Sequence, residues 1–530
     1  MKSKHLMNVL ILVIIIVYIS GGYSCKRNEA IDESEERLGR NYYINFQGDD
    51  TNDGSFNYPW RSLLNVQTTD FEPGDSLLLE GGKIFDGRLF FDAADSGQLQ
   101  APVVVSSYGN GKAIINSYEK EAMYILNGKH LEIRDLILTG AGRKEGNTSS
   151  GLVVSLSRYI QLDSLEINGY QKSGLLIYKC ADIKLVSIYA HNNGYAGISI
   201  AGSGVSKLEN RRISMHYCVV ENNPGDPTNL NNHSGNGIVI GQCTDVEISY
   251  CSAFNNGWDM PRIGNGPVGI WAWDADSVSI EHCLSFRNKT SKGGADGGGF
   301  DFDGGVTNST LQYCLSFENE GSGIGLFQYD QAGVWNNNTI RFNISINDGW
   351  VSGAKAGLLI WSASPGNPLS NCKIYNNTII NEKFAAVGFS PNTDYRAFAF
   401  INNIFIGKSE ILRGDYRDAN FYGNCWWSML SGFKIESFND LAVWRVQRNQ
   451  EQFDGNPTGV NFNPLFLEFD DIQIRDARFL GGFTLTIPNN PNLNSTGLNV
   501  ASQLGYITDN KDFYGNVPPA NGIGACFPIR

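Results

Sequence analysis

The feature that most constrains the fold is an internal repeat marked by regularly spaced cysteines. Four of them are separated by 33, 32 and 31 residues: Cys218, Cys251, Cys283 and Cys314. Each ends a segment of alternating apolar residues, and an asparagine follows five residues later: Asn223, Asn256, Asn288 and Asn319. Such spacing is typical of coils that stack on one another, because a single coil cannot bury its apolar side alone.

We expect both residue types to form ladders through successive coils. A disulfide needs cysteines arranged in pairs, whereas this spacing predicts a column. The thiols are therefore expected to point inward and to pack as small apolar groups. The asparagines are expected to stack at a turn and to hydrogen-bond along their column, which is a structural role.

A second repeat begins at a glycine and continues with alternating residues. Its copies are GISIAG from 197, GIVIGQ from 237, GIWAWD from 269, GFDFDG from 299, GLFQYD from 325 and GLLIWS from 357. Successive side chains of a strand point to opposite faces, so alignment on the glycines predicts apolar inward positions and two outward columns. One column runs Ser199, Val239, Trp271, Asp301, Phe327, Leu359, and the other runs Ala201, Gly241, Trp273, Asp303, Tyr329, Trp361.

The two ends of the chain carry a family resemblance. The segments NYYINFQGDDTNDGSFNYPWR (41–61) and KDFYGNVPPANGIGA (511–525) resemble the first and closing parts of secreted right-handed parallel β-helix proteins of the pectate-lyase-like superfamily. With the repeats, the resemblance implies an all-β, right-handed parallel β-helix. We expect an N-terminal cap and first rungs over 41–123, β-helix repeats over 124–425, and a C-terminal capping or flanking segment over 426–530, where 428–453 has helical spacing.

The N-terminus has the composition of a targeting segment. Lys2 and Lys4 precede the apolar run Val9–Ile19, and small residues lead to Cys25. Residues 1–25 resemble a bacterial lipoprotein signal, although Gly22 replaces the usual leucine, and the resemblance implies lipidation of Cys25. An ordinary cleaved signal and an uncleaved anchor helix are the alternatives. We expect an acidic tether over 26–40 and export to the outer membrane, the cell surface or the periplasmic face.

Composition narrows the range of partners. A net charge of −13 and the lack of a basic run argue against nucleic acid. No CxxC pair is present, and the six histidines form no metal-ligand pattern, so a structural zinc site is not expected. We expect a monomer that meets the membrane only through its lipid anchor and acts on an extracellular polysaccharide or oligosaccharide.

The candidate site is the stretch GGADGGGFDFDGG (293–305). Asp301 and Asp303 face outward on one strand, and no other copy of the repeat has carboxylates at both outward positions. Asp296 precedes them, and loops 222–236, 255–267 and 288–296 are expected to wall a groove that also holds Asp259, Arg262 and Lys289 nearby. Outward aromatic rings suit the apolar faces of sugars. The predicted substrate-binding residues are Trp271, Trp273, Phe327, Tyr329, Trp361, Asp330, His233 and Lys292.

Paired carboxyls favour a glycoside hydrolase, which needs one acid and one base. Outward neighbours on one strand are about 6.5–7 Å apart, at the lower edge of the inverting range of about 6.5–9.5 Å. We predict Asp301 and Asp303 as the pair, with Asp274, Asp296 or Asp330 as substitutes for one member. No cofactor is required for this chemistry.

Three other readings stay open. A polysaccharide lyase would use Lys292 or Arg262 as base, with Asp296, Asp301 and Asp303 as oxygen ligands of Ca²⁺. A non-catalytic surface protein would use the aromatic columns to bind glycans without turnover. Alternatively, loops cover the aromatic residues and form a secondary core around the aspartates.

Overall fold

The computed structural model describes residues 39–350, 355–465, 472–485, 490–506 and 511–527. The predicted signal segment with Cys25, and residues 26–38 of the predicted tether, lie outside the described residues. Gly39–Arg530 forms one compact unit. No helix of the described residues is long and apolar enough to span a bilayer.

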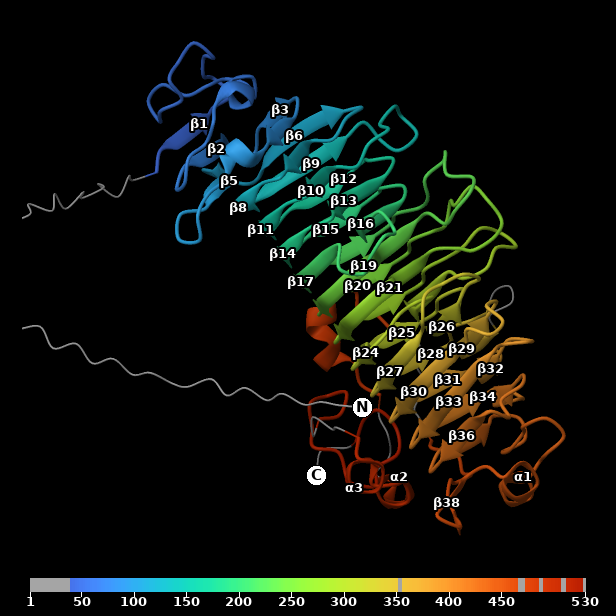
Figure 1. Cartoon of the computed structure of the whole chain (residues 1–530). Coiled ribbons are helices and arrows are strands. Elements are labelled where there is room, and N and C mark those ends of the chain that lie inside the picture. The colour runs from blue at the N-terminus through green and yellow to red at the C-terminus, as the bar shows by residue number, and fades with distance from the viewer. Residues whose placement is uncertain (1–38, 351–354, 466–471, 486–489, 507–510, 528–530) are drawn as a thin grey trace, which may run out of the picture. The chain divides into compact units, whose positions relative to one another are not determined.

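The described chain is a parallel β-helix in which each typical coil contributes three strands (Figure 1). The strands that stack at the position of the glycine-led repeat are β4 (Leu89–Phe91), β7 (Met123–Leu126), β10 (Leu152–Ser155), β13 (Ser173–Tyr178), β16 (Ala196–Ala201), β19 (Asn236–Ser249), β21 (Val268–Glu281), β23 (Gly298–Phe302), β26 (Ile324–Gln328), β29 (Ala356–Ser362), β32 (Ala385–Phe389) and β35 (Leu412–Arg413). The second strands are β1 (Asn41–Ile44), β2 (Ser76–Glu80), β5 (Val103–Tyr108), β8 (Lys129–Arg134), β11 (Arg158–Asp163), β14 (Ala181–Val186), β17 (Asn210–His216), β24 (Thr310–Gln312), β27 (Asn336–Arg341), β30 (Leu369–Tyr375), β33 (Tyr395–Ile401) and β36 (Ala419–Tyr422). Because β19 and β21 run through both positions, these strands join into one 24-stranded sheet.

The third strands form a separate 13-stranded parallel sheet. They are β3 (Ile84–Asp86), β6 (Ala113–Tyr118), β9 (Leu136–Gly140), β12 (Glu166–Asn168), β15 (Tyr189–His191), β18 (Val219–Glu221), β20 (Ser252–Phe254), β22 (Leu284–Phe286), β25 (Leu315–Phe317), β28 (Ile344–Ile346), β31 (Thr378–Asn381), β34 (Ile404–Gly407) and β37 (Cys425–Ser428). The all-β prediction is confirmed.

Both predicted ladders are present in the core. The thiols are buried and free, and the backbone N–H groups of Cys251 and Cys283 each contact the sulfur of the next cysteine at 3.4 Å. In the other ladder, side-chain amides donate from Asn256 to Asn288 and from Asn288 to Asn319, both at 2.9 Å.

The asparagine ladder ends on a carboxylate. Asn319 donates to the buried Asp348 from both its backbone and its side-chain amide, each at 2.8 Å. The cysteine column likewise turns into asparagines beyond Cys314 and ends on the buried Glu451, which accepts from the side chain of Asn424 at 2.8 Å. A terminal carboxylate suits this place because it accepts hydrogen bonds and needs no further acceptor along the column.

The outward columns follow the glycine alignment as far as β23. Trp271 pairs with Val239 on one side and with Asp301 on the other. At β26 the prediction is wrong by two residues, because Asp301 pairs with Gly325 and not with Phe327.

The physical reason lies in what the leading glycine contacts. A Cβ on Gly299 would lie 2.3 Å from Ser316 Oγ, beside the asparagine ladder, and a Cβ on Gly323 would lie 2.3 Å from Ser345 Oγ. Gly323, not Gly325, therefore begins the next copy. Phe327 consequently pairs with Trp361, and Tyr329 follows the end of β26.

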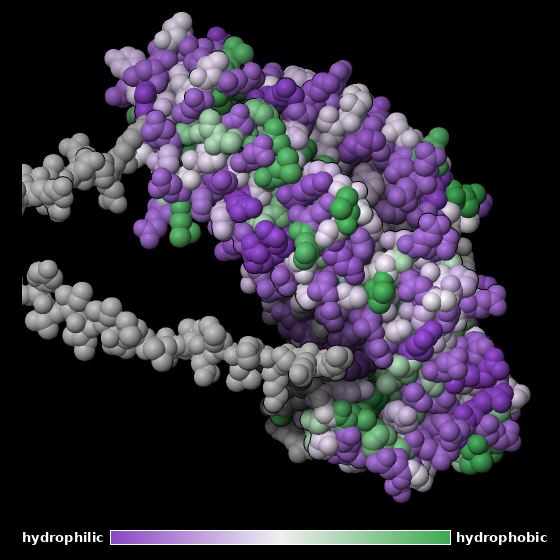
Figure 2. All heavy atoms as spheres, in the orientation of Figure 1, coloured by the Kyte–Doolittle hydropathy of each residue, from purple (hydrophilic) through white to green (hydrophobic). Residues whose placement is uncertain are grey.

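Side chains of the C-terminal segment, among them Ala477, Leu485 and Phe513, pack with apolar side chains of the 13-stranded sheet such as Phe286 and Phe317. Helix α1 (Leu441–Arg448) lies within the segment of predicted helical spacing, and its Trp444 joins the main core, where it packs on Trp426 of β37 with ring centroids 5.4 Å apart. After α1 the chain forms a hairpin of β38 (Gln452–Phe453) and β39 (Asn456–Pro457). The 3₁₀ turn η3 (Ala477–Gly482) and the short helices α2 (Pro491–Ser495) and α3 (Val500–Leu504) follow. The turns η1 (Asn65–Thr68) and η2 (Ala93–Asp95) belong to the N-terminal rungs. Figure 2 shows one mostly hydrophilic face, with scattered hydrophobic residues.

Candidate active site

A cavity of about 760 Å³ opens over the glycine-led strands. It is lined by Tyr195, Asn232, His233, Asn265, Gly266, Val268, Trp271, Trp273, Ala295, Asp296, Asp301, Asp303, Ser322, Phe327, Tyr329, Leu359, Trp361, Ser390 and Pro391. These residues come from the successive coils that carry β16 to β32. The cavity therefore crosses the strands and follows the direction in which the coils stack.

Three loops contribute pairs of residues to one wall. Asn232 and His233 belong to loop 222–236, Asn265 and Gly266 to loop 255–267, and Ala295 and Asp296 to loop 288–296. All three loops leave the helix beside the asparagine ladder, so the ladder fixes their order along the cavity.

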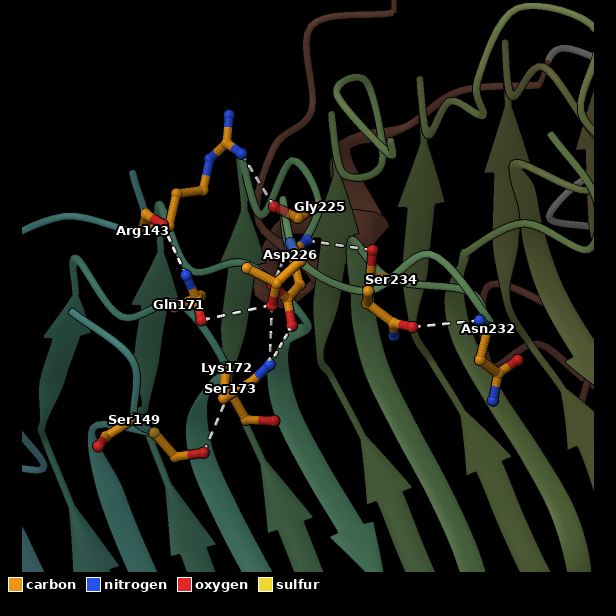
Figure 3. A network of polar contacts seen from close by, with 12 residues as sticks. Arg143, Ser149, Gln171, Lys172, Ser173, Gly225, Asp226, Asn232 and Ser234 are labelled. Atoms are coloured by element: carbon orange, nitrogen blue, oxygen red, sulfur yellow. Dashed lines mark hydrogen bonds and ion pairs between the residues drawn. The ribbon is translucent and has the colours of Figure 1, made fainter. Parts of the chain in front are cut away.

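The first of these loops is anchored by a polar network at its base (Figure 3). The carboxylate of Asp226 is 1% exposed; it accepts a hydrogen bond from Lys172 Nζ at 2.5 Å and one from Thr228 Oγ1 at 2.8 Å. Arg143 donates to the carbonyl of Gly225 at 3.0 Å. This network holds the loop that carries Asn232 and His233 into the cavity.

Three carboxyls face the cavity from one short segment. Asp301 is 3% exposed, and its Oδ1 is buried without a hydrogen-bond partner in the described chain. Asp296 and Asp303 are half-buried, and each accepts one backbone N–H, from Gly266 at 2.8 Å and from Gly304 at 2.7 Å. The two partly exposed carboxyls are therefore the ones that a ligand in the cavity can reach.

Burial raises the pKa of all three aspartates because it disfavours their charged form. It raises the pKa of Asp296 to about 6, against the opposing hydrogen bond from Gly266. It raises the pKa of Asp303 to about 7, opposed by the Gly304 N–H and assisted by the charge of Asp296. The pKa of Asp301 is raised well above its usual range by burial, and further by the charges of Asp303 and Asp296.

The aromatic residues divide into a covered group and a lining group. Trp271 is 4% exposed; its indole N–H donates to Asn236 at 3.1 Å, and the ring of His233 packs edge-on at 4.9 Å. A loop therefore covers Trp271, as the alternative of a secondary core predicted, and its ring does not offer an open face to a sugar. Trp273, Tyr329 and Trp361 remain half-buried along the cavity.

Two cavity-lining groups with altered pKa values, His233 and Tyr195, pack against each other beside Trp271. Burial lowers the pKa of His233 to about 4, with a further lowering by the charge of Arg262, so the imidazole is neutral at ordinary pH. Burial raises the pKa of Tyr195 to about 12. Tyr195, Ser322, Ser390 and Pro391 were not predicted from the sequence, because they lie in turns outside the glycine-led hexapeptides whose alignment gave the columns.

Several predicted residues lie outside the cavity. Asp274 is absent from its lining; burial raises its pKa, and the charge of Lys207 opposes this. Asp330 is exposed beyond the end of β26. Lys292 and Lys289 line a different cavity, a correction that follows from the outward turn of loop 288–296.

Asp259 and Arg262 also have other partners. Asp259 pairs with Arg143 and Lys144, and Arg262 donates to Asn265 at 2.6 Å. None of the described residues that line the cavity is a lysine or an arginine. The described chain also brings no three His, Cys, Asp or Glu side chains together as a metal-binding group.

Fold and cavity together define a parallel β-helix protein with a carboxyl-rich, aromatic-lined cleft. Residues 42–355 match the Pel9A-like, right-handed β-helix region, and the chain belongs to this family. The predicted handedness and superfamily are thereby confirmed.

Similar proteins include carbohydrate-active enzymes. A lacto-N-biosidase of Bifidobacterium longum subsp. longum is 24% identical over 70% of this chain, which spans only 29% of that protein. The crystal structure of the GH136 lacto-N-biosidase from Eubacterium ramulus has a TM-score of 0.50 at 17% identity, covering 68% of this chain and 64% of that one. The crystal structure of pectate lyase Pel9A has a TM-score of 0.45 at 16% identity, covering 92% and 97%.

Proposed function

We propose that this protein is a glycoside hydrolase acting on an extracellular polysaccharide or oligosaccharide. The observation that carries the proposal is the group of three aspartates with raised pKa values in a cleft lined by Trp273, Tyr329 and Trp361. Hydrolysis needs a protonated carboxyl for the leaving oxygen and an ionised one that acts as base or nucleophile. Raised and unequal pKa values supply both forms near neutral pH.

Accessibility supports a division of roles among the aspartates. Asp303 has a pKa of about 7 and is the proposed acid, and Asp296 has a pKa of about 6 and is its ionised partner. Asp301, which is almost fully buried, is proposed to stay protonated behind them. This revises the pair predicted from the sequence, in which Asp301 itself reacted.

Similarity to a lacto-N-biosidase supports hydrolysis of a glycosidic bond, although this chain spans 29% of that relative. The lyase alternative loses its predicted bases, because Lys292 and Arg262 do not line the cleft. Calcium binding remains a prediction, and the effect of a chelator on activity tests it. The binding-only alternative does not account for aspartates held at raised pKa values.

The test is incubation of purified protein with a panel of plant, algal and animal glycans, followed by product analysis. We expect new reducing ends without unsaturated uronide products, and no loss of activity with chelator. Asp303→Asn should lower kcat by roughly 10²- to 10⁴-fold, while Asp330→Asn, outside the cleft, should not. Unsaturated products that disappear with chelator would establish a lyase, and glycan binding without any product would establish a binding protein.

We further propose that the chain is exported and lipidated at Cys25. The support is the signal-like composition of residues 1–25. Labelled fatty acid should enter the parent protein and not Cys25→Ser. Labelling of both, or of neither, would contradict the assignment.

A further inference from the structure

A second cavity, of about 600 Å³, lies on the other side of loop 288–296. It is lined by Asn255, Trp258, Lys289, Thr290, Ser291, Lys292, Gly293 and Glu320. It shares no lining residue with the main cavity. Within one loop, residues 289–293 face the second cavity, and Ala295 and Asp296 face the main one.

The frame of this second cavity is built on the asparagine ladder. Asn255 directly precedes Asn256, Lys289 follows Asn288, and Glu320 follows Asn319. Successive ladder positions are about 4.8 Å apart. A hydrogen bond of 2.9 Å from Thr290 N–H to Glu320 Oε2 joins two of the levels.

One wall presents an aromatic surface. Trp258 is 48% exposed, and the guanidinium of Arg143 packs 5.9 Å from its ring centroid. An exposed indole at the rim of a polar cavity is typical of surfaces that bind a partner. Asn255 and Thr290 also line this cavity; Asn255 donates to Asn222 and the Thr290 hydroxyl donates to the carbonyl of Ala295 at 2.7 Å, so the Asn255 carbonyl and the Thr290 hydroxyl oxygen can serve a sugar's hydroxyl groups as acceptors.

The floor and rim carry more positive than negative charge. Lys289 is half-buried and Lys292 is exposed, and neither forms an ion pair with a carboxylate of the described chain. Glu320 supplies one negative charge against these two ammonium groups. In contrast, the neighbouring Arg143 and Lys144 are both paired with Asp259. A positive cavity is therefore maintained in a chain whose net charge is −13.

We propose that this cavity is a second carbohydrate site, which binds a sugar unit carrying a carboxylate or a sulfate. Trp258 contacts the sugar ring, and Lys289 and Lys292 bind the anionic group. The main cavity, with its three aspartates, disfavours the same ligand. Binding here requires no turnover, so the proposal does not depend on the hydrolase assignment.

The test uses three sugars that share the galactose ring and differ in their anionic group: galacturonic acid, galactose 6-sulfate and galactose. Each is titrated against the purified protein and binding is followed by NMR. Both anionic sugars are expected to bind about tenfold more tightly than galactose at low salt, and the tighter one identifies the preferred group. The difference should shrink when the ionic strength rises to about 0.3 M, because salt screens exposed charges.

Matched variants locate the site. The double variant Lys289→Gln/Lys292→Gln should abolish the preference for anionic sugars. Trp258→Ala should weaken the binding of both anionic sugars. The control is Lys184→Gln with Lys408→Gln, which removes two exposed lysines elsewhere and should change nothing. Equal binding of the three probes, or equal loss in the control, would overturn the proposal.

Discussion

Asp301 of β23 pairs with Gly325 of β26, a residue with no side chain to cover the carboxyl. The space is taken by the ring of Phe327, which folds back over the glycine. A Cβ on Gly325 would lie 2.7 Å from Phe327 Cζ and 3.2 Å from Asp301 Oδ1. An aromatic ring thus flanks the buried aspartate even though Phe327 is two residues away in register.

Gly325→Ala should therefore disturb the cleft. The new methyl group displaces the Phe327 ring or the Asp301 carboxyl, and we expect activity to fall about tenfold with a Tm loss of a few degrees. The measurement is kcat/KM together with thermal unfolding. Gly482→Ala is the control, because a Cβ there meets no atom within 4 Å. Unchanged activity in Gly325→Ala would mean that the ring position is unimportant.

The pH dependence of kcat/KM should be bell-shaped. Activity falls below about pH 6, as Asp296 becomes protonated, and above about pH 7, as Asp303 loses its proton. His233, with a pKa of about 4, remains neutral over this window and contributes no limb. The residual activity of Asp296→Asn should lack the acidic limb. A parent profile that is flat from about pH 5 to pH 8 would contradict the assigned roles.

The network beneath loop 222–236 should control substrate affinity more than turnover. Lys172→Met leaves the buried Asp226 without its cationic partner, and the loop carrying His233 loses an anchor. We expect KM to rise about tenfold while kcat stays within about threefold. Lys172→Arg should restore most of the affinity, and Lys184→Met on the exposed side of β14 serves as control. A fall in kcat with KM unchanged would refute a role in positioning the loop.

Asp348 should make stability depend on pH. Its pKa is raised to about 7 by burial, against the hydrogen bonds from Asn319 and Ser345. The folded chain therefore binds this proton more tightly than the unfolded chain, whose aspartate titrates near 3.8, and stability falls as pH rises from about 4 to about 7.

Asp348→Asn keeps an acceptor for Asn319 and cannot ionise. The difference in Tm between Asp348→Asn and the parent protein should increase by a few degrees from about pH 5 to about pH 8. The exposed Asp330→Asn is the control and should show no such trend. An equal effect of Asp348→Asn at both pH values would contradict the linkage.

The sequence by itself determined the architecture. Cysteines and asparagines at near-constant spacing indicate stacked coils, because coils of nearly equal length place residues about thirty positions apart in one column. The same periodicity identified the segment with Asp296, Asp301 and Asp303, because alternation along a strand fixes which side chains face outward.

Only the tertiary structure decided what surrounds that segment. The register at β26 depends on which glycine packs against Ser345, a contact between coils that no local pattern specifies. The cover over Trp271 and the outward turn of Lys292 follow from loop conformations, whereas the ring of Phe327 flanks Asp301 because of the register at β26. The repeats predict the strands because every coil packs in the same way. Each loop has its own sequence and path, so its contacts can be seen only in the folded structure.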